Sequence, residues 1–216
     1  MMKPVFAAAL AVAALVALPA AAQTAAPAAD IGAVRPSDRV VGSMDAPVTM
    51  TVYVSTTCSH CAEWHNEVLP QVAAKYVTTG KVRLVYRDLP TAPADIAQAG
   101  AVLARCAPTD KFDTVMDQLF RHQSVLFGAT SQDDLNDRAI AWLGNAGVTA
   151  GMTGEQIGGC LTDETNWSDL NARVEASRAD GVRGTPTFFV NGVPAEIDFH
   201  TAAAFDAVLE PLLAGR

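Results

Sequence analysis

The stretch Val52-Tyr53-Val54-Ser55-Thr56-Thr57-Cys58-Ser59-His60-Cys61-Ala62-Glu63-Trp64-His65 decides the fold of this chain. Its first residues belong to an apolar run rich in β-branched and aromatic side chains, which predicts a buried strand. A short polar turn follows, and two cysteines separated by two residues then open a predicted helix. A helix N-terminus carries a partial positive charge and unpaired N–H groups, and both favour a thiolate over a thiol. We therefore predict a redox-active pair in which Cys58 is the exposed nucleophile and Cys61 is the resolving thiol.

The segments on both sides of this stretch predict an α/β layer that is interrupted by helices. The order is β-α-β, then a block with no strand pattern, then β-β-α, so the block is an insertion between two halves of one layer. The predicted elements are strands at 48–55, 81–87, 187–190 and 193–197, helices at 58–76, 94–107, 110–123, 131–143, 153–161, 163–179 and 201–213, and a hairpin turn at Asn191-Gly192. Pro70 can kink the first helix, and Gly144 is expected to end the fourth.

The N-terminus has the pattern of a secretory signal peptide. Lys3 supplies a positive charge, residues 5–18 are apolar and uncharged, and small residues at 20–22 precede the expected cleavage site. A membrane anchor is the alternative, but this apolar run is shorter than the roughly 20 residues that a spanning helix needs. The expected segments are a signal peptide at 1–22, a flexible leader rich in alanine and proline at 23–40, the first part of the α/β layer at 41–93, the helical insertion at 94–180 and the second part of the layer at 181–216.

The composition limits the partners that the chain can have. The chain has 216 residues, half of them hydrophobic, a formal net charge of −8 and a pI of about 4.8. This length supports one domain with an insertion. Because the acidic balance leaves no basic patch for phosphate groups, neither nucleic acid nor an anionic membrane is expected as a partner.

The cysteine pair at Cys58 and Cys61 has two alternative interpretations, a zinc half-site and a structural disulfide. A zinc site of the ribbon type needs a second Cys-x-x-Cys or a histidine pair, which the sequence lacks. A disulfide across so small a loop would stabilise the fold little. We therefore expect redox chemistry and no metal, with the N–H of His60 donating to the Cys58 sulfur and favouring its thiolate.

Two further cysteines, Cys106 and Cys160, lie in the predicted helical block. In an exported chain, four cysteines are expected to be oxidised in pairs, and counting alone leaves three pairings open. A second redox relay and a structural disulfide between Cys106 and Cys160 are the two interpretations, and we favour the disulfide. Closing so long a loop could stabilise the fold by roughly 4 kcal/mol.

Three further positions, besides the cysteines, need an interpretation. Thr185-Pro186 precedes a strand, where a cis proline would leave the preceding backbone free to pair with an extended substrate. His65 follows Cys61 by one helical turn and is expected to be a packing histidine, although it could tune the site. The pair Arg87-Asp88 is interpreted as a solvated strand end.

These motifs together resemble the DsbA-like thiol–disulfide oxidoreductases, an exported bacterial family with a thioredoxin fold and a helical insertion. The resemblance covers residues 40–213, and it is carried by residues 57–65, the strand 82–88, Leu103-Ala104-Arg105-Cys106-Ala107 and residues 184–192. It implies an α/β thioredoxin fold whose β-α-β and β-β-α parts flank an all-helical insertion.

The resemblance also implies roles for particular residues. Cys58 and Cys61 would form the redox-active disulfide, with His60 in the usual histidine position, Pro186 as the facing cis proline and no other cofactor. Cys106–Cys160 looks like the non-catalytic disulfide of some alphaproteobacterial-type members. A monomeric periplasmic oxidase would follow, which donates its disulfide to exported proteins with free thiols and is reoxidised by a quinone-linked membrane partner.

The chain departs from the family pattern at three positions. The best-known members have proline at the position of Ser59, and many thioredoxin-fold enzymes have a buried carboxylate at the position of Val52. Proton transfer must then use water, Glu63 or another group. Thr185 resembles the isomerases and reductases as much as the oxidases. Two alternatives therefore stay open: a disulfide reductase or isomerase that works in the reduced direction, and a thioredoxin-fold metal-binding or holdase module.

Overall fold

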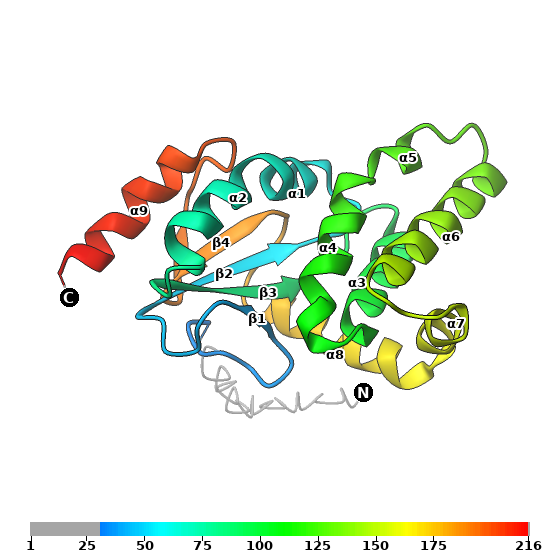
Figure 1. Cartoon of the computed structure of the whole chain (residues 1–216), viewed down its shortest axis with the longest axis horizontal. Helices are drawn as coiled ribbons and strands as arrows, with labels where there is room; N and C mark the ends of the chain where they lie inside the picture. The colour runs from blue at the N-terminus through cyan, green and yellow to red at the C-terminus, as the bar shows by residue number, and fades with distance from the viewer. Residues whose placement is uncertain (1–30, 216) are drawn as a thin grey trace, which may run out of the picture.

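The computed structural model of the chain describes residues 31–215 as a central sheet with helices on both faces and a helical block at one end (Figure 1). The predicted signal peptide and residues 23–30 of the predicted leader lie outside the described residues. The strands are β1 (Arg39–Val41), β2 (Val48–Val54), β3 (Val82–Asp88), β4 (Thr187–Val190) and β5 (Val193–Ala195). The helices are α1 (Ser59–Glu63), α2 (Leu69–Val72), α3 (Ala94–Cys106), α4 (Phe112–Arg121), α5 (Ser124–Phe127), α6 (Gln132–Thr149), α7 (Gly154–Thr162), α8 (Glu164–Ala179) and α9 (Ala202–Ala214).

The strands form one mixed sheet in the order β1-β3-β2-β4-β5. β2 pairs parallel with β3 and antiparallel with β4, so the predicted β-α-β and β-β-α units share the central strand. The hairpin turn has positive φ at Asn191 and Gly192, as a two-residue turn of the predicted kind requires. Pro194 lies on β5 at the sheet edge, where its missing N–H removes no ladder hydrogen bond.

All of β2 is buried, because helices cover both faces of the sheet. Alternate residues point to opposite sides: Met50 and Val52 lie in the larger apolar cluster with Phe205 of α9. Tyr53 lies in a second, smaller cluster with Phe189. The helix that begins at Ser59 reaches residue 77 through two π-helical segments, η1 (Trp64–Val68) and η2 (Ala73–Val77). The first of these ends two residues before Pro70, so the predicted kink takes the form of a widened turn.

The helical block follows β3 and contains no strand within residues 94–180, as predicted. α3 contacts α4, α6 and α7, whereas α8 returns to pack on β3 (Figure 1). α6 does not stop at Gly144 but continues to Thr149, so that part of the prediction is wrong. The reason is tertiary: at Gly147 an added Cβ would lie 2.6 Å from Ile157, so this glycine allows close helix packing and does not end the helix. Within residues 31–215, none of the helices has the length and apolar character needed to cross a bilayer.

Two features of the sheet differ from the sequence-based expectations. Residues 31–40 were assigned to a flexible leader, but they lie against the sheet, and Arg39–Val41 pairs antiparallel with β3. Arg87 and Asp88 were interpreted as a solvated strand end, which is wrong, because both are buried. Arg87 ion-pairs with Asp38 at 3.0 Å, so the ordered leader supplies the charge that allows this arginine to be buried.

Candidate active site

Cys58 lies where the chain passes from β2 into α1, at the helix N-cap. Its backbone N–H donates to the Ser55 carbonyl at 3.1 Å, which closes the turn, and its own carbonyl accepts from Ala62 at 3.1 Å. The side chain is partly exposed, and both Cys58 and Cys61 are free thiols in this structure. The strand and the helix therefore fix the backbone of Cys58 while its sulfur remains accessible.

The surroundings of Cys58 favour its thiolate and lower its pKa to about 5. The largest cause is the hydrogen bond from the Cys61 thiol, and partial burial opposes it. The Thr185 side chain and the backbone N–H groups of Cys61 and His60 lower the pKa further. These two N–H groups act by proximity, because the sulfur makes no capping hydrogen bond of regular geometry.

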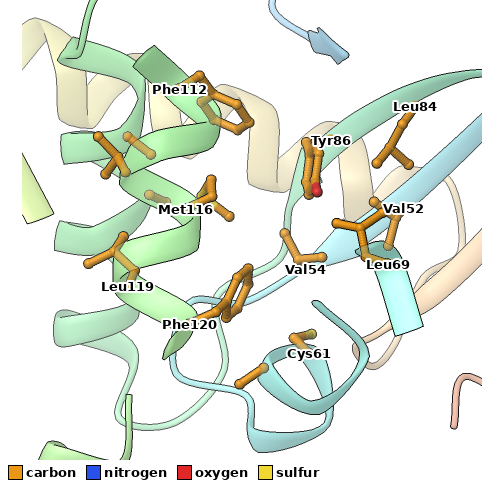
Figure 2. Close-up of a cluster of buried hydrophobic side chains, with 14 of the residues drawn as sticks. Val52, Val54, Cys61, Leu69, Leu84, Tyr86, Phe112, Met116, Leu119 and Phe120 are labelled. Atoms are coloured by element: carbon orange, nitrogen blue, oxygen red, sulfur yellow. The ribbon is translucent and has the colours of Figure 1, made fainter. Parts of the chain in front are cut away.

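Cys61 differs from Cys58 in every respect that controls reactivity. It is fully buried, and burial followed by the neighbouring Cys58 raises its pKa well above the ordinary value. Figure 2 shows it in the buried apolar cluster that also contains Val52 and Val54. The structure thus favours a thiolate at Cys58 and a protonated thiol at Cys61. Val52 contributes no proton acceptor to this pair.

His60 acts on Cys58 through its main chain. Its imidazole is exposed and lies against the ring of Phe199, with ring centroids 5.4 Å apart. The ring of His200 stacks on that of Phe199, with ring centroids 4.0 Å apart. The His200 Nε2 lies 3.6 Å from Glu63 Oε1. The imidazole ring therefore forms part of the rim around the dithiol.

Thr185 and Pro186 lie opposite Cys58, immediately before β4, and the peptide bond between them is cis. The Cys58 thiol donates to the Thr185 carbonyl at 3.2 Å. The Thr185 hydroxyl is buried and has no hydrogen-bond partner among residues 31–215, and it favours the thiolate of both cysteines. Ionisation of Cys58 would give this hydroxyl an acceptor.

Gln123, after the end of α4, is a site residue that the sequence analysis missed. It is buried, and its Nε2 donates to the Thr56 carbonyl at 2.8 Å and to the Cys58 carbonyl at 3.0 Å. α3 approaches the same turn so closely that a Cβ at Gly100 would lie 2.5 Å from Thr56 Oγ1. The insertion thus holds the cysteine turn through side chains that carry no sequence motif.

We expect replacement of Gln123 with glutamate to raise the pKa of Cys58. A carboxylate would face two carbonyl oxygens and add a negative charge near the thiolate, which disfavours ionisation. Titration of the thiolate by its ultraviolet absorbance measures the change. Gln118→Glu, on α4 beside α6, is the matched control, and an equal shift in both variants would contradict a local effect.

His65 packs against α4, as expected from the sequence. It is buried against the Phe120 ring, with centroids 4.8 Å apart, and its Nε2 lies 3.7 Å from Asp117. Burial lowers its pKa to about 4. It therefore packs between η1 and α4 as a neutral side chain.

Cys106 and Cys160 are joined by a disulfide that links the last turn of α3 to α7, with Cα atoms 6.0 Å apart. Asn166 donates to the Cys106 sulfur at 3.4 Å and to the Cys160 carbonyl at 3.0 Å. Among residues 31–215, the side-chain hydrogen bonds at this disulfide stay within the helical block, through Val102 and Asn166, so the bond supports that block.

Replacing both Cys106 and Cys160 with alanine should lower the free energy of unfolding by about 2–4 kcal/mol. The disulfide spans 54 positions of the chain, and its loss increases the conformational entropy of the unfolded chain. Urea unfolding of the two proteins, each with Cys58 and Cys61 alkylated, measures the difference. A change below about 0.5 kcal/mol, the usual size of a surface substitution effect, would contradict a stabilising role.

The lowered pKa of Cys58 should appear directly in a pH titration of the reduced chain. We expect a thiolate midpoint near pH 5. This titration should be absent in Cys58→Ser, and its midpoint should rise in Cys61→Ala, because that variant lacks the hydrogen bond that lowers the pKa of Cys58 most. Because the folded pKa lies below the ordinary value of 9.0, ionisation stabilises the reduced fold fully above pH 9 and not at all below about pH 5. Stability of the reduced chain should therefore fall as the pH drops through this window, and a pH-independent stability would contradict it.

Comparison with known proteins identifies the family to which this chain belongs. A family model described as thioredoxin matches residues 35–210. The chain belongs to the thioredoxin family. Within residues 31–215 of this thioredoxin-family chain, no group of three or more His, Cys, Asp or Glu side chains is arranged to hold a metal ion.

Individual relatives agree with this assignment. A protein of Rickettsia bellii, provisionally named a protein-disulfide oxidoreductase, is 30% identical over 74% of this chain and 59% of its own length. The chain thus spans less than two thirds of that relative. Among solved structures, alpha-DsbA1 of Wolbachia pipientis has a TM-score of 0.72 at 22% identity, over 84% of this chain and 94% of that one. A protein-disulfide isomerase of Novosphingobium aromaticivorans has a TM-score of 0.69 at 22% identity, over 82% and 97%. The predicted thioredoxin fold with a helical insertion is confirmed.

Proposed function

We propose that this chain is a DsbA-type protein thiol–disulfide oxidoreductase, which donates the Cys58–Cys61 disulfide to exported proteins with free thiols in the periplasm. The observation that carries the proposal is the asymmetry of the pair. Cys58 is accessible with a lowered pKa, whereas Cys61 is buried with a raised pKa. The signal-peptide pattern supports export, and the names of the relatives support the class of reaction.

The exchange proceeds in two thiolate attacks. A substrate thiolate first attacks the Cys58 sulfur, a mixed disulfide forms, and the Cys61 sulfur leaves and takes up a proton because its pKa is high. A second substrate thiolate then attacks the substrate sulfur of the mixed disulfide and expels Cys58. The substrate dithiol is oxidised, and the cysteine pair is reduced by the same two electrons. The lowered pKa of Cys58 makes it a good leaving group in the second step.

Binding of the substrate falls to the segment before β4. The Thr185 carbonyl is within 3.2 Å of the Cys58 sulfur, so an extended peptide paired with this backbone would bring its cysteine to the nucleophile. Thr185 and Pro186 are therefore the proposed substrate-binding residues. A quinone-linked membrane protein is the proposed reoxidant, and the proposed acting form is a monomer.

The direction of the reaction rests on the pKa of Cys58. A pKa of about 5 lies between the values of about 7 for thioredoxin and about 3.5 for a strong oxidase. A lower pKa stabilises the reduced pair and makes the disulfide more oxidising. This value supports the proposal of a centre that is more oxidising than thioredoxin.

A redox titration of Cys58–Cys61 against glutathione tests the proposal. We expect a reduction potential between about −200 and −120 mV. The titration is run on the chain with Cys106 and Cys160 intact and on the double alanine variant, which separates the two disulfides. Failure of the pair to exchange with glutathione at all would refute an oxidoreductase.

A disulfide reductase or isomerase is the second candidate. The presence of Thr185 before the proline favours it. The same titration separates a reductase from the proposed oxidase, because a reductase would titrate near the value of about −270 mV known for thioredoxin. In that case, Cys58–Cys61 would be held reduced in the cell.

A further inference from the structure

A cavity of about 490 Å³ lies between β1, the end of α3 and α8. Its lining includes three arginines from three separate segments: Arg39 on β1, Arg105 in the last turn of α3 and Arg173 on α8. None of its lining residues belongs to the cysteine turn or to the segment before β4. The cavity is therefore a feature separate from the proposed redox centre.

The positive charges of this cavity outnumber the carboxylates that meet them. Asp88 Oδ2 accepts from Arg105 Nη2 at 3.0 Å and from Arg173 Nε at 2.7 Å. Arg39 has no ion pair with any carboxylate among residues 31–215, and its Nη2 donates only to the Arg105 carbonyl, at 3.0 Å. The other acidic lining residue, Asp169, is exposed. Three guanidinium groups thus share one buried carboxylate.

Two buried donors in the cluster also lack acceptors. The Nε atoms of Arg39 and Arg105 are shielded from solvent and have no hydrogen-bond partner in the described part of the chain. A buried N–H without an acceptor is unfavourable. Burial, followed by the charges of Arg105 and Arg173, lowers the pKa of Arg39. An anion in the cavity would reduce the repulsion among the three guanidinium groups.

We propose that this cavity binds a tetrahedral oxyanion, either sulfate or phosphate, through Arg39, Arg105 and Arg173. The planar fork of a guanidinium matches the oxygen spacing of such anions. Positive charge remains in excess after pairing with Asp88, and the second acidic lining residue, Asp169, is exposed, so the cavity favours an anion. The site does not depend on the redox chemistry proposed for Cys58 and Cys61, and its occupation would also join β1, α3 and α8 across one ligand.

Isothermal titration of the chain with sodium sulfate, and separately with sodium phosphate, tests the site at an ionic strength held constant with chloride. We expect one saturable site per chain. The affinity of Arg39→Gln for the anion should be lower by about tenfold or more, because this variant loses a charged donor. The matched control is Arg178→Gln, which removes the same charge from an exposed position of α8 and should bind as the unmodified chain does.

Three results would overturn the proposal. They are the absence of saturable binding for both anions, equal affinity in Arg39→Gln and the unmodified chain, and tighter binding of a dicarboxylate such as succinate than of sulfate. If Arg39→Gln does not fold, as judged by circular dichroism, Arg39→Lys replaces it. This variant keeps the charge but loses the planar guanidinium fork, so it should bind several-fold more weakly, and unchanged affinity would again overturn the site. None of these measurements involves the thiols, so their outcome is independent of the proposed function.

Discussion

Replacing Cys58 with serine will abolish disulfide exchange. Cys58 supplies the sulfur that the substrate attacks in the first step and the thiolate that leaves in the second, and Cys61, which is buried with a raised pKa, cannot take its place. We expect the rate of oxidation of a reduced test peptide to fall by at least about a thousandfold, to the level of the buffer. The measurement is the loss of free peptide thiol after mixing with the oxidised chain or with the variant.

Cys61→Ser provides the matched comparison. It retains the Cys58 nucleophile but cannot resolve a mixed disulfide, so a covalent complex with a disulfide-bearing peptide should accumulate and be visible on a non-reducing gel. The double replacement of Cys106 and Cys160 should keep the exchange activity. Substantial turnover by Cys58→Ser would show that another cysteine carries the reaction.

Replacing Arg87 with methionine will lower the free energy of unfolding by about 3–5 kcal/mol. Arg87 is only 3% exposed. Its guanidinium contacts Asp38 through Nε and Nη2 at 3.1 and 3.0 Å, and Nη1 donates to the Tyr53 hydroxyl at 3.0 Å. That hydroxyl donates to Asp180, 2.6 Å away. Removing Arg87 therefore leaves buried negative charge without its partner.

Urea unfolding of the Arg87→Met chain measures this change. Arg121→Met is the control, because Arg121 is half exposed and pairs with Asp117 on the surface of α4. Such surface pairs contribute only about 0–1 kcal/mol. Equal effects of the two substitutions would show that the buried network adds nothing beyond an ordinary surface pair.

Most of the fold could be predicted because its elements have strong local patterns. β2 is a continuous apolar run, α7 has a capping box at Thr153 and Gln156, and Asn191-Gly192 determines the last hairpin. β1 was missed because only three residues form it and its stability comes from pairing with β3. Local propensity predicts a helix end at Gly144, because glycine is disfavoured within helices, whereas packing with α7 stabilises α6 beyond it.

The candidate site was predictable where residues adjacent in sequence act together. Cys58, His60 and Cys61 belong to one turn and helix start, so a local pattern contains their relation. Gln123 was not predictable, because a single glutamine after a helix has no motif and its role depends on where the insertion places it. Thr185 was predictable as part of the segment before β4, but its hydroxyl lowers the pKa of both thiols only because the pairing of β4 with β2 brings it to them.

The sequence by itself determined the dithiol, the order of the strands and helices, and the presence of a helical insertion, because these depend on local spacing and hydrophobic periodicity. Only the tertiary structure decided how the charges are distributed. In an acidic chain without a basic run, folding brings Arg39, Arg105 and Arg173 to one cavity and buries Arg87 between Asp38 and Asp180. The physical reason is that electrostatic interactions depend on distance in space and on burial, and neither can be read from separation along the chain.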